Sequence, residues 1–264
     1  VARGAELPGD DRLLVFDDIS EIVSAQRAQA WGEVARRLAH EIKNPLTPIQ
    51  LSAERLEMKL TGKLATGDQA ILNKSVKTIV DQVEAMKRLV NEFRDYARLP
   101  AAELTPVDLN VLVHDVVQLY ENNSAVPVVL DLEPNCPMVM GDAQQLRQVI
   151  HNLLQNAQDA CEAMPTDPEA ERTVTLRTQW QSGTERVRLS VLDSGAGFPE
   201  KILKRAFEPY VTTKSKGTGL GLAVVKKIAD EHGARVDIKN RMLDGLVVGA
   251  QVSLSLATDK GAQA

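Results

Sequence analysis

A sustained heptad pattern of apolar residues constrains this chain more than any other feature of its sequence. Between residues 72 and 97 the apolar positions are separated by alternating steps of four and three. They are Leu72, Val76, Ile79, Val83, Met86, Val90, Phe93 and Ala97. Such spacing is typical of a helix that packs along its whole length against another helix.

A second helix is indicated upstream, where similar spacing is found at Trp31, Ala35, Leu38, Ile42 and Ile49. Turn signals at residues 61–63 and 66–68 separate the two segments, so the sequence predicts a helical hairpin. A single hairpin covers its apolar stripe only in part, whereas two hairpins bury it in a four-helix bundle. We therefore expect a homodimer through the hairpin. Packing of the hairpin against the second half of its own chain is the alternative.

The second half of the chain mixes helices and strands. Helical patterns are found at residues 108–121, 142–164 and 218–232, and strand patterns at residues 126–132, 174–180, 187–192, 236–239 and 247–256. These proportions predict an α/β sandwich, and the whole chain is α+β. The expected organisation is a dimerisation hairpin over residues 29–100, a hinge linker over 101–106, the sandwich over 107–258 and a tail over 259–264.

Composition excludes several classes of function. With 36 acidic and 31 basic residues the net charge is -5, and only 3% of residues are aromatic, so general nucleic-acid binding is not expected. Cys136 and Cys161 lie far apart and are expected to be free thiols. No apolar run has the length of a membrane helix, and the chain begins with Val1. We expect a soluble piece of a longer protein, without membrane contact of its own.

His40 is the first candidate for chemistry. If Leu38 and Ile42 belong to the seam, His40 lies on the solvent-facing side of the helix. A zinc site of the His-Glu-x-x-His type is excluded, because Asn44 stands where the second histidine is required. A neutral imidazole can act as a nucleophile, more strongly when a carboxylate such as Glu41 accepts the proton of its other nitrogen. A solvated surface histidine without function is the alternative.

Two glycine-rich segments are candidates for a ligand site. Residues 193–197, Asp-Ser-Gly-Ala-Gly, follow a predicted strand, so the Asp193 carboxylate can accept a hydrogen bond from an exocyclic amine such as that of adenine. Residues 217–221, Gly-Thr-Gly-Leu-Gly, open a predicted helix, whose free N–H groups favour phosphate. Neither a Walker loop nor a dinucleotide fingerprint is present. Residues 207–216 are predicted to form a mobile lid with cations for phosphate, and an ordinary tight turn at 193–197 is the alternative.

A pair of asparagines completes the set. Asn152 and Asn156 are four residues apart on the predicted helix 142–164, so they share one side of it. Amide oxygens suit Mg²⁺ that bridges to substrate phosphates. Two solvent-exposed asparagines without a ligand are the alternative.

Together and in this order, these motifs resemble those of the sensor histidine kinases of bacterial two-component systems. The ATP domain of that family belongs to the gyrase/Hsp90/MutL group. The resemblance covers residues 29–256 and pairs each family motif with a segment: the H box with residues 40–46, the N box with 152–156, the first glycine box with 193–197, the F box with Phe207 and the second glycine box with 217–221. Residues 40–55 further resemble the NtrY-type nitrogen-regulation kinases. Residues 12–23 resemble the end of a PAS sensor domain, which assigns residues 1–28 to such a domain and its signalling helix.

The resemblance also implies roles for individual residues. His40 is implied as the phosphoacceptor, Glu41 as its orienting carboxylate and Asn44 as the group that positions water when phosphate is removed from the partner. Asn156 is implied as the Mg²⁺ ligand, with Asn152 near the phosphates. The other residues implied in ATP binding are Asp193, Gly195, Gly197, Phe207, Lys214, Gly217, Thr218, Gly219, Leu220 and Gly221. Ser194 and Val211 depart from the family, which commonly has an asparagine and an aromatic residue there.

The function that the resemblance implies is ATP-dependent autophosphorylation of His40. Transfer to an aspartate of a response regulator follows, with an NtrX-type regulator suggested, together with phosphatase activity towards it. The expected location is the cytoplasmic portion of an inner-membrane sensor kinase. Two other functions stay open: an ATPase of the gyrase/Hsp90/MutL type, in which the histidine is incidental, and a catalytically silent dimeric scaffold.

Overall fold

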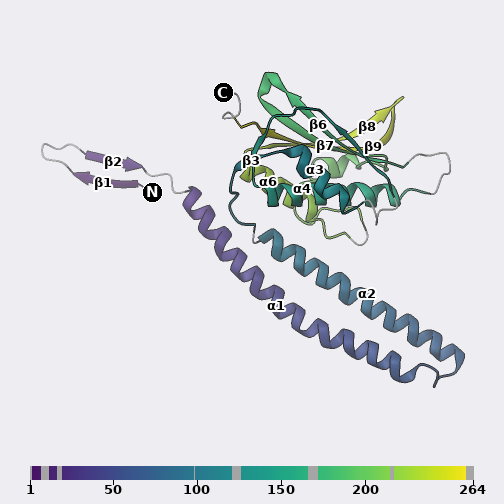
Figure 1. Cartoon of the computed structure of the whole chain (residues 1–264). Helices are drawn as coiled ribbons and strands as arrows, with labels where there is room; N and C mark the ends of the chain where they lie inside the picture. The colour runs from purple at the N-terminus through teal and green to yellow at the C-terminus, as the bar shows by residue number, and fades with distance from the viewer. Residues whose placement is uncertain are drawn as a thin grey trace. The chain divides into compact units, whose positions relative to one another are not determined.

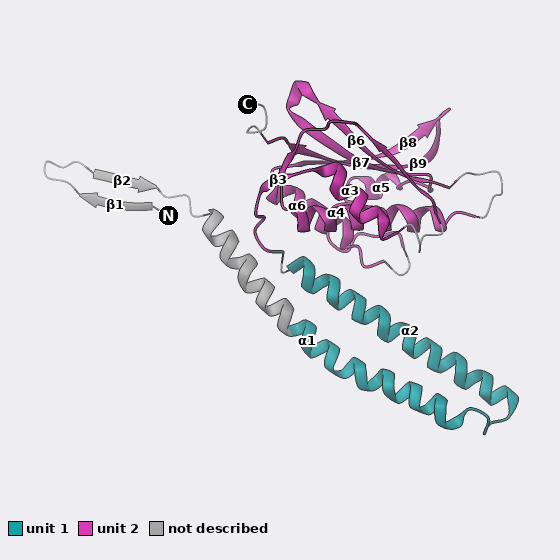
Figure 2. Cartoon of the chain, in the orientation of Figure 1, with its two compact units in different colours: residues 1–99 teal, residues 100–264 magenta. Residues whose placement is uncertain are grey.

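The computed structural model describes residues 2–6, 12–16, 20–97, 99–120, 126–165, 172–214 and 217–259, with side chains from Leu38 onward. The chain divides into two compact units, residues 1–99 and residues 100–264 (Figure 2). Among the helices of the described part, none combines the length and the apolar composition needed to cross a membrane.

The first unit contains two long helices, α1 (Ser20–Leu60) and α2 (Thr66–Ala97), which form the predicted hairpin (Figure 1). It also contains two antiparallel strands, β1 (Ala2–Glu6) and β2 (Arg12–Phe16). Helix α1 continues through Pro45 and Pro48. Because proline has no N–H, each of them leaves a carbonyl of the preceding turn without its usual helical partner.

The hairpin buries only one of the two apolar positions of each heptad. The residues buried between the helices follow at steps of seven: Ala39, Leu46 and Ala53 on α1, and Val76, Val83, Val90 and Ala97 on α2. The other position forms a second seam. Its members Ile42, Ile49 and Leu56 on α1, and Ile79 and Met86 on α2, are 40–55% exposed, and Leu72 and Phe93 at the two ends of the α2 pattern are half-buried. The heptad pattern is therefore confirmed, and the second seam stays partly exposed within one chain.

The phase of the α1 seam differs from the prediction. Leu38, which we placed at the seam, is 42% exposed, and the buried residue is Ala39. Small side chains let two helices approach closely, and the buried residues include Ala39 and Ala53 on α1 and three valines on α2. The predicted seam residues Trp31 and Ala35 lie outside the residues whose side chains are described.

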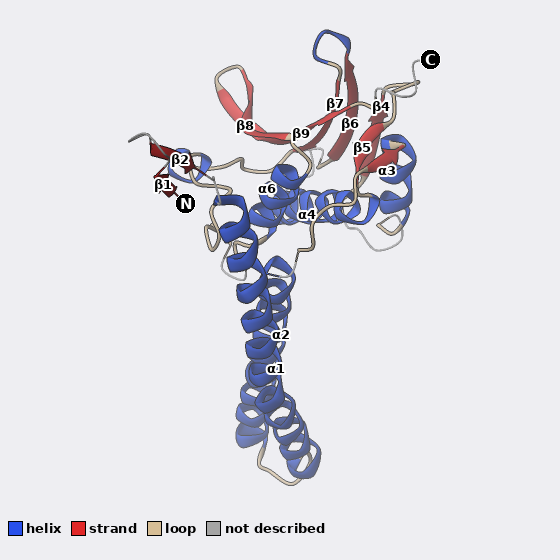
Figure 3. Cartoon of the chain, turned by 90° about the vertical axis from the view of Figure 1, so that its left-hand side faces the viewer, coloured by secondary structure: helices blue, strands red, loops and turns tan. Residues whose placement is uncertain are grey.

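The second unit is a five-stranded sheet covered on one face by helices α3, α4 and α6 (Figure 3). The strand order is β4 (Val128–Leu132), β6 (Val174–Gln181), β7 (Arg186–Asp193), β9 (Leu246–Ala257), β8 (Arg235–Leu243). Only β4 and β6 pair in parallel, and the other neighbours are antiparallel. The covering helices are α3 (Leu109–Gln118), α4 (Ala143–Glu162) and α6 (Gly221–Glu231), so the predicted sandwich is confirmed.

Smaller elements were not predicted. Strands β3 (Thr105–Val107) and β5 (Val139–Gly141) form a separate antiparallel pair, and α5 (Glu200–Leu203) and the 3₁₀ turn η1 (Ser182–Thr184) are single turns. Residues 105 and 106, which we assigned to the linker, therefore belong to the second unit. The Gln145 side chain donates to the Pro100 carbonyl, and the Glu103 amide donates to Asp142 Oδ2, at 2.9 and 3.3 Å. These bonds attach Pro100 and Glu103, a residue of the predicted linker, to the beginning of α4.

The start of α4 is held at both its side chain and its backbone. Asp142 caps the helix as predicted, because its Oδ1 accepts from the amides of Gln144 and Gln145. The Asp142 amide donates to Nε2 of His232, 2.9 Å away, and Nδ1 of His232 donates to the carbonyl of Ile228 at 2.8 Å. His232 is 5% exposed, so it joins the end of α6 to the beginning of α4 inside the core. Cys136 and Cys161 are free, as expected.

Replacing His232→Ala is expected to lower the free energy of unfolding of the second unit by about 2–4 kcal/mol, because two buried hydrogen bonds and a buried ring are lost. The measurement is urea unfolding followed by circular dichroism. The matched control is His114→Ala, an exposed histidine on α3, which should change the value by less than about 0.5 kcal/mol. Equal effects of the two substitutions would contradict the structural role of His232.

Candidate functional site

Asp193 stands at the end of β7 and is only 7% exposed. One carboxylate oxygen, Oδ1, accepts hydrogen bonds from the amides of Gly195 and Ala250, at 2.9 and 3.0 Å. Within the described residues, no donor bonds to the second oxygen. The carboxylate is thus held rigidly by the backbone, with one oxygen left to accept a hydrogen bond from a ligand.

Burial raises the pKa of Asp193 above its ordinary value. The hydrogen bonds from Gly195 and Ala250, followed by the charges of Arg241 and Lys214, oppose this rise. Keeping a carboxylate in such a place costs stability, since its charged form loses hydration. A buried carboxylate with a specific set of partners is a candidate functional group.

Two glycines allow other backbone segments to pass close to Asp193. At Gly249 of β9, φ is +143°, and a Cβ would lie 1.9 Å from the Asp193 carbonyl oxygen. At Gly195, a Cβ would lie 2.9 Å from the Cβ and carbonyl oxygen of Ala160 on α4. The turn that follows β7 is therefore packed between β9 and α4, with no room for larger residues.

Ser194 is one of the two departures from the family pattern, and its hydroxyl is engaged in the structure. Ser194 Oγ accepts from the Thr173 amide at 3.0 Å and lies 3.5 Å from Sγ of the buried Cys161. The serine therefore ties the turn to the start of β6. Val211, the other departure, is half-buried.

Helix α4 supplies the polar side of the site. Asn152 and Asn156 are both half-buried. Lys214 Nζ donates to Asn156 Oδ1 at 3.1 Å and to Asp159 Oδ2 at 2.8 Å. Gly221 lies next to Asn156, since a Cβ on the glycine would be 3.4 Å from the amide nitrogen. The structure thus brings together the lysine of the predicted lid, the helix asparagine and the second glycine segment.

The second glycine segment leads directly into α6. Leu220 at the cap position is fully buried and anchors the segment, and no side chain caps the helix. The first N–H groups of α6 therefore have no side-chain partner at the cap and suit an anion. Gly217, Thr218 and Gly219 are half-buried, and the Gly219 carbonyl accepts from the Tyr210 amide at 3.0 Å.

The rest of the predicted lid is described in part. Phe207 is half-buried, and the Tyr210 backbone has a φ of +66°. Lys216 lies outside the described residues. The lid lysine that the structure places is thus Lys214.

His40 lies in the first unit and is exposed, as predicted. Glu41 and Asn44 are exposed on the same stretch of α1, while Ala39 and Leu46 are buried against α2. The inner stripe of the hairpin therefore leaves the imidazole accessible from outside.

Sequence reasoning missed the contributions of Asp159 and of the β8–β9 pair. Asp159 has a readable signal, because it is three residues after Asn156 and so lies on a neighbouring part of the same helix face. The Ala250 amide and the Arg241 side chain carry no motif. They reach Asp193 only through the pairing of β7, β9 and β8.

Two family models match the chain in the order of its two units. Residues 30–102 match the His Kinase A (phospho-acceptor) domain, and residues 141–260 match the Histidine kinase-, DNA gyrase B-, and HSP90-like ATPase. Both matches coincide with the segments that carry the candidate residues.

Full-length relatives show the same kinship. Nitrogen regulation protein NtrY of Azorhizobium caulinodans is 41% identical over 229 residues, which are 86% of this chain and 29% of that protein. Sensory histidine kinase/phosphatase NtrB of Rhodobacter capsulatus is 34% identical over 238 residues, covering 84% of this chain and 61% of that protein. The crystal structure of full-length ShkA in complex with AMPPNP has a TM-score of 0.62 and 27% identity, and it covers 86% of this chain and 46% of that chain.

The chain thus spans less than a third of the length of the Azorhizobium protein. Its two domains and its relatives nevertheless agree with each other and with the motifs around His40 and Asp193. The chain belongs to the two-component sensor histidine kinases, and within that family it is of the NtrY type.

Proposed function

We propose that this chain is a catalytic core that uses ATP to phosphorylate His40 and then passes the phosphoryl group to an aspartate of a response regulator. The observation that carries the proposal is the buried Asp193 carboxylate, anchored through one oxygen by two backbone amides, in the same chain as an exposed histidine. Such a reaction requires a group that binds the base of ATP and an accessible nucleophile, and these two residues provide them.

The residues of the second unit fit ATP from base to phosphates. Asp193 accepts the adenine amine with its second oxygen, and the N–H groups at the start of α6 and the Lys214 ammonium meet the phosphates. Asn156, with Asn152 beside it, is the Mg²⁺ ligand. This donor set fits a cation, because Asn156 Oδ1 already accepts from the Lys214 ammonium. Bound Mg²⁺ supplies neutralisation of the charge on the transferring phosphoryl group.

The reaction on His40 is a displacement at phosphorus. A nitrogen lone pair of His40 forms a bond to the γ-phosphorus while the bond to the bridging oxygen breaks, and ADP leaves with that electron pair. Glu41 stabilises the charge that develops on the ring by facing the proton of the other nitrogen. Catalysis is then chiefly positioning and charge neutralisation, as in other phosphoryl transfers.

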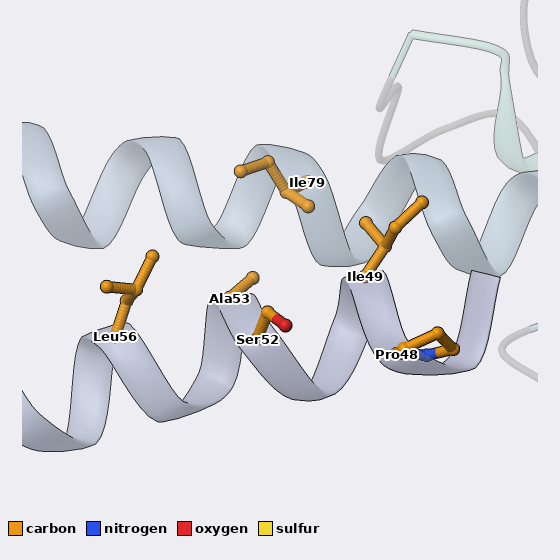
Figure 4. Close-up of a pocket in the computed structure, with 6 residues that line it drawn as sticks. All are labelled: Pro48, Ile49, Ser52, Ala53, Leu56 and Ile79. Carbon is orange, nitrogen blue, oxygen red and sulfur yellow. The ribbon is translucent and has the colours of Figure 1, made fainter. Parts of the chain in front are cut away.

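Dimerisation follows from the second seam. Pro48, Ile49, Ser52, Ala53 and Leu56 of α1 and Ile79 of α2 line a groove of about 360 Å³ on the hairpin (Figure 4). A second hairpin covers these apolar side chains in a four-helix bundle.

The regulator is of the NtrX type, and Asn44 positions water when the phosphoryl group is removed from it. The whole protein is an inner-membrane sensor with this portion in the cytoplasm.

Incubation with Mg²⁺ and γ-labelled ATP tests the central step. Wild-type protein should acquire acid-labile, base-stable label, and both His40→Gln and Asn156→Ala should lose it, because one lacks the nucleophile and the other the metal ligand. The matched control is His114→Gln, which replaces an exposed histidine elsewhere and should keep the label. Steady ATP hydrolysis that is unaffected by His40→Gln, with no label on the protein, would instead favour the ATPase alternative.

Asp193→Asn separates nucleotide binding from folding. The asparagine oxygen can still accept from the amides of Gly195 and Ala250. The asparagine NH₂ group, a donor, then faces the amine of adenine, which is also a donor. ATP affinity should fall roughly 100-fold, measured by titration calorimetry.

The stability of Asp193→Asn, unlike its ATP affinity, should not fall. Because the pKa of Asp193 is raised in the fold, the wild-type free energy of unfolding falls as pH rises through that pKa. The asparagine variant lacks this loss, so its unfolding midpoint at neutral pH should equal or exceed that of wild type. A clear drop in the midpoint would mean that the charge itself is needed for folding.

Ile79→Lys should convert the dimer to a monomer, because a charge then stands in the apolar groove. The buried seam of Val76 and Val83 is untouched, so helicity should be retained. Sedimentation and circular dichroism measure the two properties. Glu84→Lys is the control: five residues further along, at about 100° per residue, it lies on the far side of α2, and it should stay dimeric. Monomeric wild-type protein would contradict the dimer.

A further inference from the structure

The turn after β7, residues 194–198, contacts the β8–β9 pair. Asn240 of β8 makes two hydrogen bonds to one residue of that turn: its Nδ2 donates to the Phe198 carbonyl, and its Oδ1 accepts from the Phe198 amide, each at 2.8 Å. The Asn240 side chain thus supplies the donor and the acceptor that the backbone of a neighbouring strand would supply, and Phe198 itself belongs to no strand. Few side chains can do this, because donor and acceptor must be presented together.

The next residue binds the beginning of the same turn. Arg241 Nη1 donates to the Asp193 carbonyl at 2.7 Å. Immediately beyond it, the pairing of β8 with β9 shifts register between Arg241 and Met242. Such irregularities are frequent next to active sites, where they redirect a side chain.

The close packing of the turn shows that these contacts leave little freedom. A Cβ on Gly197, whose φ is +70°, would lie 2.8 Å from Asn240 Oδ1 and 2.5 Å from Val247 Cγ1. A Cβ on Gly195 would lie 2.9 Å from the Cβ and carbonyl oxygen of Ala160 on α4. The turn is therefore clamped at Gly195 by a helix and at Gly197 by the hairpin.

We propose that Asn240 and Arg241 are positioning residues for the nucleotide: together they fix the backbone on both sides of Gly195 and so hold the Asp193 carboxylate where it meets the adenine amine. The inference rests on the proposed function, in which Asp193 binds ATP. Neither residue touches the ligand in this scheme. Asn240 sets the path of the turn, and Arg241 sets the carbonyl of Asp193 itself.

The charge of Arg241 adds a second contribution. It lowers the pKa of Asp193, against the larger effect of burial, and Lys214, from the loop before α6, acts in the same direction. Arg241 therefore helps to keep the carboxylate in the ionised form that accepts a hydrogen bond.

Autophosphorylation kinetics of Asn240→Ala test the first half of the inference. The KM for ATP should rise roughly tenfold or more, as expected for the loss of two hydrogen bonds, while kcat at saturating ATP stays close to wild type, because the phosphate end of the site is unchanged. The matched control is Asn110→Ala. Asn110 also makes two hydrogen bonds, to the Glu133 carbonyl and from the Thr178 hydroxyl, but away from the turn, so its KM should not change.

The outcomes separate this inference from the function on which it rests. If wild type binds ATP and Asn240→Ala keeps the wild-type KM, or if Asn110→Ala raises the KM equally, the inference is overturned alone. Wild-type protein that binds no ATP overturns the proposed function and this inference with it.

The pH dependence of ATP affinity tests Arg241 even if Asn240→Ala fails to fold. In Arg241→Gln the pKa of Asp193 should rise, so affinity should be lost at a higher pH on the acid side than in wild type. Arg241→Lys keeps the positive charge and should restore most of the wild-type profile, with Lys214 present in both variants. Identical pH profiles for wild type and Arg241→Gln would overturn the electrostatic part of the proposal.

Discussion

The candidate site of the second unit is built around one buried carboxylate. Asp193 sits at the end of a central strand, and the amides of Gly195 and Ala250 hold one of its oxygens. A fold gains little from such a group, because burial disfavours its charge. Its position is understandable if the second oxygen serves a ligand. The glycines at 195 and 249, the Arg241 contact and the close approach of α4 all constrain the backbone beside it.

The first unit satisfies a different constraint. Each heptad carries two apolar positions, and the hairpin can bury only one of them. The stripe that includes Ala39 and Leu46 packs inside, the second seam stays available for another hairpin, and His40 is exposed. The proposed role of His40 requires that the ring be reached by an ATP domain and then by a regulator. Its exposure on α1 is compatible with both.

Much of the fold was readable because its signals are local. Asp142 caps α4 as predicted, and His232 and Gly233 stand where the predicted last helix ends. The candidate site was readable at Asn156 and Asp193, where a motif marks the residue. Strands β3 and β5 were not, since three-residue strands carry no periodicity. The attachment of Pro100 and Glu103 to α4 was not predictable either, because it depends on contacts with Gln145 and Asp142.

By itself, the sequence determined the helical hairpin, the sandwich, the exposed histidine and the two glycine segments, because heptads, caps and turn residues act over a few neighbouring positions. Only the tertiary structure decided that Ala39 rather than Leu38 is buried, that Lys214 lies on Asn156, and that Asn240 and Arg241 hold the turn after Asp193. These contacts join residues tens of positions apart. They depend on strand register and on how closely helices pack, and neighbouring residues in the sequence determine neither of these.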